Sequence, residues 1–247
     1  MTPENNAEYV RLRRGLSDAE WMLPPTLVAT FQQAAWNRLA ARCGIPDAAN
    51  RGPEVMPVAG CVDGVRVAAV WMMVGAPAAA LSLEAAIARG VRDILVVGSA
   101  GSLREDLPIG STVLVSAAER EDGTSHHYLA AGEVVESDPG LSDRLEGCAV
   151  ERGLRPLRGR AWTIDAPFRE TVGAIRRHSD AGVLVVEMEA AAMFAVARVR
   201  GVRAALIVAV SDELGHSEWR PGFADRRYSD TLLTAADAVL ACAAGMA

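Results

Sequence analysis

Three carboxylate side chains follow predicted buried strands in the last third of the chain. Glu187 and Glu189 come directly after the apolar run 183–186, and Asp212 comes shortly after the run 204–210. Short β-branched and apolar runs of this kind are typical of strands that are buried on both faces. A carboxylate can accept two hydrogen bonds from a sugar diol, and a carboxylic acid can protonate a leaving group. These residues are therefore candidates for ligand binding and acid catalysis.

The segment between the two runs predicts how these carboxylates are positioned. Residues 190–200 contain strong helix formers, and Gly201 is expected to end the helix. A strand, a helix and a strand in this order predict a right-handed unit with two parallel strands, and ligands bind beyond the carboxyl ends of such strands. We therefore expect both acidic segments to face one crevice. Glu187 and Glu189 share a face only if the chain stays extended, so we expect one of them to reach the pocket.

The same residues also have a purely structural interpretation. A helix dipole stabilises carboxylates near a helix N-terminus, which explains at least one of the two glutamates, and Ser211 or Asp212 suits a helix cap. Arg169 and Glu170 are either a salt-bridged helix surface or a pair that contacts a base or a sugar. Two histidines in the polar segment 122–128 have no evident further metal ligands, so packing within a loop explains them better.

A glycine-containing segment follows another buried strand, which is predicted over residues 93–97. Residues 98–102 have the sequence GSAGS. A turn of this composition lets backbone N–H groups and a hydroxyl approach an anion or a sugar closely. The segment lacks the Gly-Lys-Ser/Thr ending of a Walker A loop and the GxGxxG pattern. Taken alone, it is better explained as a plain tight turn.

Composition bounds the class of protein. The chain has 247 residues, of which 51% are hydrophobic, which suits one large α/β domain. A net charge of −6 without a basic block argues against nucleic-acid binding. We find neither a run that approaches the roughly 20 apolar residues of a membrane span nor a signal-peptide core. Widely spaced cysteines argue against disulfides or a zinc site and fit a reducing cytoplasm: Cys43, Cys61, Cys148 and Cys242.

The order of elements predicts one catalytic domain over residues 26–247. Residues 1–25 are a polar N-terminal arm that either packs on a partner subunit or is loosely held. Thr26 suits the N-cap of a helix over 26–43, and a β-hairpin with an Asp-Gly turn is predicted over 58–74. Alternating strands and helices then predict a parallel or mixed sheet covered on both faces. The other predicted elements are helices over 78–89, 141–152, 168–178 and 231–244 (the last capped by Ser229 or Asp230), strands over 112–117 and 159–164, and a loop over 119–128.

Taken together, these segments resemble the nucleoside phosphorylase/nucleosidase family, which includes uridine phosphorylase, purine nucleoside phosphorylase and methylthioadenosine nucleosidase. The resemblance implies an α/β fold with a mixed, barrel-like central sheet flanked by helices. It also implies cleavage of a ribosyl N-glycosidic bond by phosphate or water, without a metal or organic cofactor, in a cytoplasmic homo-oligomer (a dimer, or a hexamer built as a trimer of dimers). The segments that carry the resemblance are 98–101, 109–113, 122–125, 186–190 and 210–212.

The resemblance implies roles for the acidic segments and their neighbours. Glu189 would bind the ribose hydroxyls, Met188 would line the sugar, and Glu187 would support them at the substrate. Asp212 matches the acid that purine-cleaving members place near the base nitrogen. The transition state resembles an oxocarbenium ion, so orienting the sugar and protonating the base both lower the barrier. The other residues assigned by resemblance are Ser99 and Gly75 at the phosphate, Ala100 and Gly101 beside the sugar and base, and Phe168 and Arg169 by the base.

The sequence departs from the family on the phosphate side. We find no Gly-Asp-Pro loop after a first strand, and Val96 stands where many members have an arginine. Ala100 replaces a common hydroxyl residue. Phosphate would then need other donors, such as Arg42, Arg51, Arg120 or an arm from a neighbouring subunit. Phosphorolysis is the leading hypothesis, and hydrolysis by a nucleosidase or nucleoside binding without catalysis are the alternatives.

Base preference stays open at this point. Asp212 indicates purines, whereas the region 163–170 looks closer to the uridine-type branch but lacks its usual Gln and Arg pair.

Overall fold

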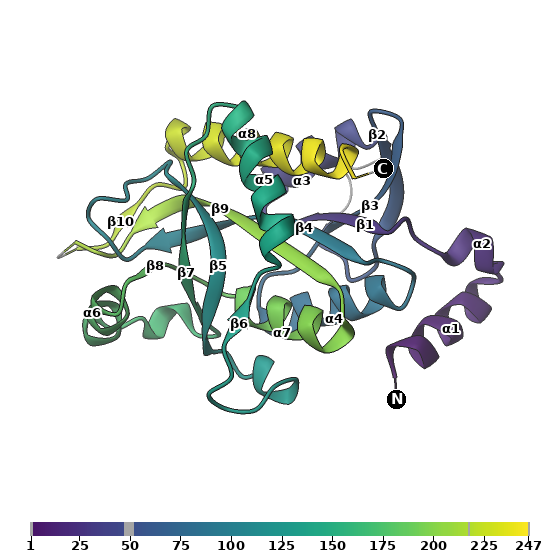
Figure 1. Ribbon diagram of the computed structural model, residues 1–247, viewed down its shortest axis with the longest axis horizontal. Helices are drawn as coiled ribbons and strands as arrows, with labels where there is room; N and C mark the ends of the chain where they lie inside the picture. Colours follow the sequence, from purple (N-terminus) through teal and green to yellow (C-terminus); the bar gives the residue numbers. More distant parts are fainter. Residues whose placement is uncertain (1, 47–51, 217, 247) are drawn as a thin grey trace.

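Within residues 2–46, 52–216 and 218–246, which this computed structural model describes, a closed five-stranded barrel forms the centre of the fold (Figure 1). Parallel and antiparallel pairs both occur in it, and the pairing of Gly101 with Val186 joins the last strand back to the first. The expected α/β fold with a mixed, barrel-like sheet is therefore confirmed. In spatial order the barrel strands are β4 (Asp93–Ser102), β9 (Arg203–Glu213), β5 (Thr112–Glu121), β7 (Leu157–Ile164) and β8 (Val183–Glu187).

Further strands extend the sheet outward from β4. β1 (Thr26–Thr30) lies between β4 and β3 (Val65–Trp71) and is parallel to both, and β2 (Val58–Val62) is antiparallel to β3. The predicted hairpin is confirmed, because Asp63 and Gly64 adopt φ of 47° and 86°, as a type I′ turn requires. Two short strands, β6 (Val135–Glu136) and β10 (Arg220–Pro221), pair with β5 and β9.

Helices cover the sheet in two layers, each over its own apolar core (Figure 1). One layer contains α4 (Ala76–Ile87) and α7 (Ala190–Arg200), which contact each other. The opposite layer contains α3 (Gln33–Arg42), α5 (Pro139–Glu151) and α8 (Arg226–Ala244). No helix in the described part of the chain is long and apolar enough to span a membrane.

The first strand corrects a prediction, because residues 26–30 are not helical. All five residues of Thr26–Thr30 are buried between β3 and β4, and the helix begins only at Gln33. The short run TLVAT suits a strand, but the partner strands that fix it come from distant parts of the chain. A first strand therefore exists. It is followed by Phe31-Gln32 and not by the Gly-Asp-Pro sequence that many family members have there.

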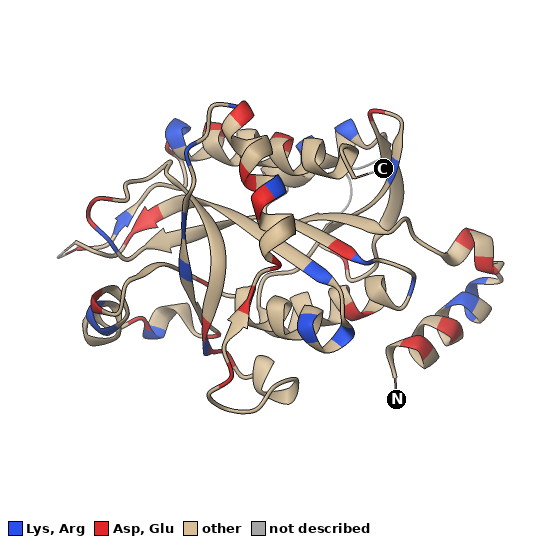
Figure 2. Cartoon of the chain, in the orientation of Figure 1, with Lys and Arg blue, Asp and Glu red and all other residues tan. Residues whose placement is uncertain are grey.

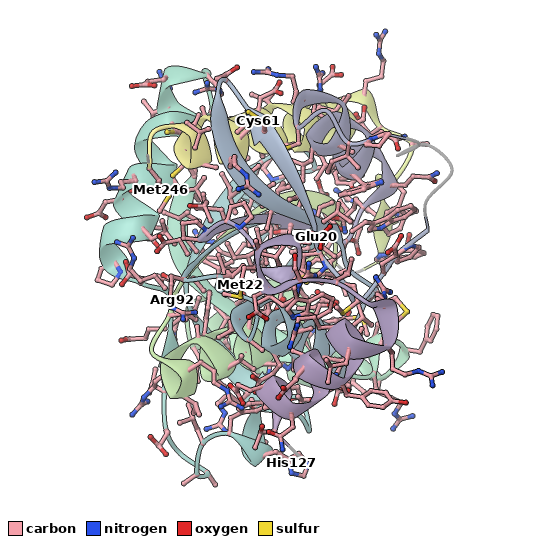
Figure 3. All side chains as sticks on the ribbon, turned by 90° about the vertical axis from the view of Figure 1, so that its right-hand side faces the viewer. Glu20, Met22, Cys61, Arg92, His127 and Met246 are labelled. Atoms are coloured by element: carbon pink, nitrogen blue, oxygen red, sulfur yellow. The ribbon has the colours of Figure 1, made fainter. Side chains whose placement is uncertain are left out.

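The N-terminal segment is helical. It contains α1 (Pro3–Arg14) and α2 (Asp18–Trp21), along which acidic and basic residues are interspersed (Figure 2). A capping box between Ser17 and Glu20 begins α2. Buried Trp21 lies under the Arg89 guanidinium, 4.3 Å from the ring centroid, and its carbonyl accepts a hydrogen bond from Arg89 Nε. Figure 3 looks onto this end of the molecule, with Glu20 and Met22 in front of the core. These contacts hold the end of the segment at Trp21 against the core. Packing of the arm on a partner subunit stays a prediction.

The predicted parallel unit of β8 and β9 is wrong. β4 lies between the two strands, parallel to β9 and antiparallel to β8. Local sequence patterns indicate each strand but not the direction in which it joins a closing barrel. The carboxyl ends still converge, because Gly101 of β4 pairs with both Val186 of β8 and Asp212 of β9.

Several element boundaries also differ from the prediction. Residues 98–102 are the end of β4 rather than a turn, with an irregular register between Ala100 and Gly101. β5 continues to Glu121, into the segment predicted as loop. The helix expected from Phe168 begins later, as α6 (Val172–Asp180), because Pro167–Arg169 form a 3-10 turn. Asp225 caps α8, which therefore begins before the predicted Ser229 or Asp230.

Candidate active site

A cavity of about 700 Å³ opens where the carboxyl ends of β4, β8 and β9 meet. The convergence of these ends explains why acidic segments far apart in the sequence face one space. Arg169 is not among the lining residues, although its neighbour Phe168 is. Gly75 is also absent from the lining but contacts a lining side chain. The predicted site residues that line the cavity are Ser99, Ala100, Gly101, Phe168, Glu187, Met188, Glu189 and Asp212.

Glu189 is held at the start of α7 by a backbone donor from α4. Its Oε1 accepts a hydrogen bond of 2.5 Å from the N–H of Gly75, which adopts a φ of 106° at the N-cap of α4. The carboxyl is buried, and burial together with the charge of Glu187 raises its pKa above the usual range of a glutamate. The Gly75 N–H therefore already has an acceptor in Glu189. A phosphate contact at Gly75 stays a prediction.

Glu187 also lines the cavity, so the expectation that only one of the two glutamates reaches it is wrong. The chain leaves the extended conformation at Glu189, whose φ and ψ are −138° and −32°. Glu187 Oε2 accepts hydrogen bonds from the N–H groups of Glu189 (2.8 Å) and Ala190 (2.7 Å), and Oε1 accepts one from the Thr163 hydroxyl. Burial raises its pKa. Protein donors therefore occupy both of its oxygens, as in a helix cap.

Asp212 is fixed by two side-chain donors. Its Oδ1 accepts a hydrogen bond from the Ser211 hydroxyl (2.7 Å), and its Oδ2 accepts one from Trp219 Nε1 (2.8 Å). A Cβ atom on Gly101 would lie 3.2 Å from Oδ2, so glycine leaves room for this arrangement. Trp219 was not predicted as a site residue from the sequence. An indole in a polar loop shortly after the candidate acid was the available signal.

Gln32 is a second residue that the sequence analysis missed. It follows β1 and lines the cavity, and its Nε2 donates a hydrogen bond of 2.8 Å to the Ser99 hydroxyl. The predicted helix over 26–43 concealed this position, because the connection after a strand is where a ligand-contacting loop is expected.

The described lining is acidic and contains no basic residue. All 25 Lys and Arg positions of the chain are arginines, and in the described residues they are interspersed with acids along the chain (Figure 2). Arg42 pairs with Asp63 at 3.4 Å, and Arg120 donates to Ser125 Oγ at 2.9 Å, so neither reaches the cavity. Arg51 lies outside the described residues. The expectation that Arg42 or Arg120 of the same chain binds phosphate is therefore wrong.

The polar segment 122–128 is organised by its own hydrogen bonds. Asp122 accepts hydrogen bonds from the backbone N–H and the hydroxyl of Ser125, both at 2.6 Å. Among the described residues, no three His, Cys, Asp or Glu side chains are grouped to hold a metal ion.

Comparison with known proteins places these features in a family. The model of the phosphorylase superfamily matches residues 48–244. Guanosine phosphorylase from Halorubrum lacusprofundi is 30% identical over 178 residues, which cover 72% of this chain and 74% of that protein. Uridine phosphorylase from Haemophilus influenzae is 22% identical, covering 70% and 74% of the two chains. A DeoD-type purine nucleoside phosphorylase from Bacillus cereus is 25% identical, covering 63% and 67%.

The fold is also found in a solved structure. The crystal structure of purine nucleoside phosphorylase from Toxoplasma gondii in complex with immucillin-H superposes with a TM-score of 0.79 over 94% of each chain, at 17% identity. At this identity the likeness concerns the fold alone, whereas the family model covers most of the chain. The chain belongs to the phosphorylase superfamily.

Proposed function

We propose that the protein cleaves the ribosyl N-glycosidic bond of a nucleoside by phosphorolysis, which yields the free base and ribose 1-phosphate. The named relatives are nucleoside phosphorylases, and family membership supports the same reaction class here. The observation that carries the proposal is the convergence of Glu189, Asp212 and Ser99 on one cavity. These side chains provide an acceptor for sugar hydroxyls, an acid for the base and a hydroxyl donor for phosphate.

The buried glutamates suit the charge that develops on the sugar. As the glycosidic bond breaks, the ribosyl group gains oxocarbenium character, and nearby carboxylates stabilise it. Glu189 uses Oε1 for the Gly75 N–H, so Oε2 is the acceptor that we assign to the ribose hydroxyls. Hydroxyl donors favour the ionised carboxylate, against the burial that raises its pKa. Met188 supplies the apolar wall beside the sugar.

The base end of the cavity is formed by Asp212, Phe168 and Trp219. A base leaves more readily as a neutral molecule, so a proton must reach one of its ring nitrogens as the bond breaks. We assign this general acid chemistry to Asp212, with Trp219 holding its carboxyl in position. An acid at the base nitrogen favours purines, and one of the named relatives is a guanosine phosphorylase.

The nucleophile side lacks a positive charge among the described lining residues. Ser99 and Gln32 offer only uncharged hydrogen-bond donors there. Binding a phosphate dianion requires a cationic side chain as well. We infer that the protein is a homo-oligomer in which a second copy supplies an arginine. Hydrolysis is the second candidate, favoured specifically by the acidic lining, because water needs no cation. Neither reaction requires a metal or an organic cofactor.

A panel of purine and pyrimidine nucleosides, incubated with and without inorganic phosphate, tests this proposal. Chromatography of the products should show ribose 1-phosphate and free base only when phosphate is present. Free ribose without phosphate would establish hydrolysis instead. If no nucleoside releases its base, both candidates are wrong. Asp212→Asn should slow turnover chiefly in kcat, and Glu189→Ala should weaken sugar binding and turnover together.

A reducing, cytoplasmic setting is also part of the proposal. Burial raises the pKa of the Cys43 thiol to about 11 and that of Cys242 to about 12, so both stay protonated at neutral pH. The cysteines are free thiols, as a reducing compartment maintains them: Cys43, Cys61, Cys148 and Cys242.

A further inference from the structure

Glu170 is a carboxyl of the cavity that the proposed mechanism has not used. It follows the 3-10 turn Pro167–Arg169 and precedes Thr171, the N-cap of α6, and its N–H donates to the Pro167 carbonyl at 3.2 Å. The side chain is partly buried and lines the cavity together with Asp212. The 3-10 turn before Glu170 and the start of α6 after it therefore hold this residue at the base end of the cavity.

The surroundings of Glu170 differ from those of Asp212. Each Asp212 oxygen accepts a hydrogen bond from a side-chain donor, whereas no described residue donates a hydrogen bond to the Glu170 carboxyl. Partial burial without hydrogen-bond donors favours the protonated, neutral form of a carboxyl over the charged form. Burial, with the nearby charge of Asp212, raises the pKa of Glu170 to about 7. At neutral pH a large fraction of Glu170 therefore carries a proton.

We propose that Glu170 is a second acid at the base end of the cavity, which shares a proton with Asp212 and supplies it to the departing base. This inference rests on the proposed nucleoside cleavage. Two carboxyls that face one space hold a single proton between them more readily than two charges. This refines the acid role of Asp212, because the acid is then the pair of carboxyls rather than Asp212 alone. Asp212, ordered by Ser211 and Trp219, orients the base and shares the proton, and Glu170 carries it before transfer.

The proton balance of this step is closed. Phosphate oxygen forms a bond to the anomeric carbon as the bond from that carbon to the base nitrogen breaks, and the electron pair of that bond stays on the base. The base takes the proton of the Glu170 carboxyl and leaves neutral, while Glu170 becomes a carboxylate. The proton that the new phosphate monoester releases to solvent is equivalent to the one that restores Glu170.

A substrate whose base leaves without protonation separates this role from a structural one. Guanosine needs a proton on its base, whereas the base of 7-methylguanosine already carries the positive charge. Glu170→Gln keeps the shape of the side chain but cannot act as an acid. We expect it to slow guanosine cleavage by about tenfold to a hundredfold and 7-methylguanosine cleavage by less than about threefold. For a pyrimidine-specific enzyme, uridine and 4-nitrophenyl riboside replace this pair.

The pH profile gives a second readout. Wild-type kcat with the substrate that needs protonation should fall as pH rises through about 7, because Glu170 loses its proton there, and Glu170→Gln should lack this fall. Glu170→Asp retains an acidic side chain. Its rate should therefore lie between those of Glu170→Gln and the wild type. Glu151→Gln, on the exposed end of α5, is the matched control and should match the wild type.

The outcomes distinguish this inference from the proposed function. Equal slowing of both substrates by Glu170→Gln, or a wild-type rate with both, would overturn the acid role while nucleoside cleavage stands. Absence of base release by the wild-type protein from every nucleoside would overturn the proposed function, and the inference with it.

Discussion

Glu187, in the wall of the cavity, accepts hydrogen bonds from the backbone at the start of α7. Replacing it by alanine should therefore destabilise the protein. The carboxylate accepts hydrogen bonds from the N–H groups of Glu189 and Ala190 and from the Thr163 hydroxyl. All three donors belong to buried residues. Each buried backbone donor left without an acceptor costs about 1–3 kcal/mol. The two N–H groups alone therefore predict a loss of about 2–6 kcal/mol of unfolding free energy.

The charge of Glu187 makes this loss depend on pH. Burial raises the pKa of the folded-state carboxyl above its value of 4.5 in the unfolded chain. A group of this kind contributes its full stability below the unfolded-state pKa and loses it as pH rises through the folded-state pKa. Wild-type stability should therefore decline with rising pH, and the alanine variant lacks the part of this decline that Glu187 causes. The difference between the two proteins should be about 3 kcal/mol near pH 5 and smaller near pH 9.

Urea unfolding followed by circular dichroism at the two pH values measures this difference. Glu151→Ala is the control, since the Glu151 side chain is 77% exposed and its removal should change stability by less than about 0.5 kcal/mol. A loss of less than about 1 kcal/mol of unfolding free energy near pH 5 would show that Glu187 does not cap α7. A difference between the two proteins that widens as pH rises would contradict the raised pKa of Glu187.

Three further substitutions address the cavity itself. Trp219→Phe keeps an aromatic ring but removes the hydrogen bond to Asp212, so kcat should fall about tenfold with little change in KM; an unchanged kcat would exclude a positioning role. Gln32→Ala should raise the KM for phosphate about fivefold while the KM for nucleoside stays within about twofold, because Gln32 holds Ser99; a change in the nucleoside KM alone would place Gln32 elsewhere. Phe168 is 100% exposed, so Phe168→Ala should leave thermal unfolding unchanged yet raise the nucleoside KM about fivefold; loss of stability without a KM effect would contradict base contact.

Local chemistry made part of this fold predictable from the sequence. The Asp-Gly hairpin turn and the end of α7 at Gly201 depend on residues that favour a positive φ, which are visible without any partner. The acidic segments were expected in one crevice, and the cavity contains Glu187, Glu189 and Asp212. That outcome depended on strand ends converging, which alternating strands and helices commonly produce.

The features that the sequence analysis missed depend on contacts between distant residues. The strand Thr26–Thr30 owes its conformation to β3 and β4 on either side, which no local pattern reports. The direction of β8 is set by closure of the barrel onto the end of β4. Gln32 meets Ser99 across 67 positions of sequence, so its place in the cavity followed only from the fold. The separation of an N-terminal arm from a domain at residues 25 and 26 stays a prediction.

The most direct test of the proposed phosphorolysis follows base release and phosphate together in one reaction. Phosphorus NMR of the purified protein with a nucleoside and inorganic phosphate reports a new phosphomonoester, while absorbance reports the free base. Phosphorolysis predicts that the phosphomonoester appears in step with the base, and that both stop when phosphate is withheld. Base release at the same rate without phosphate, and with no new phosphorus signal, would contradict it.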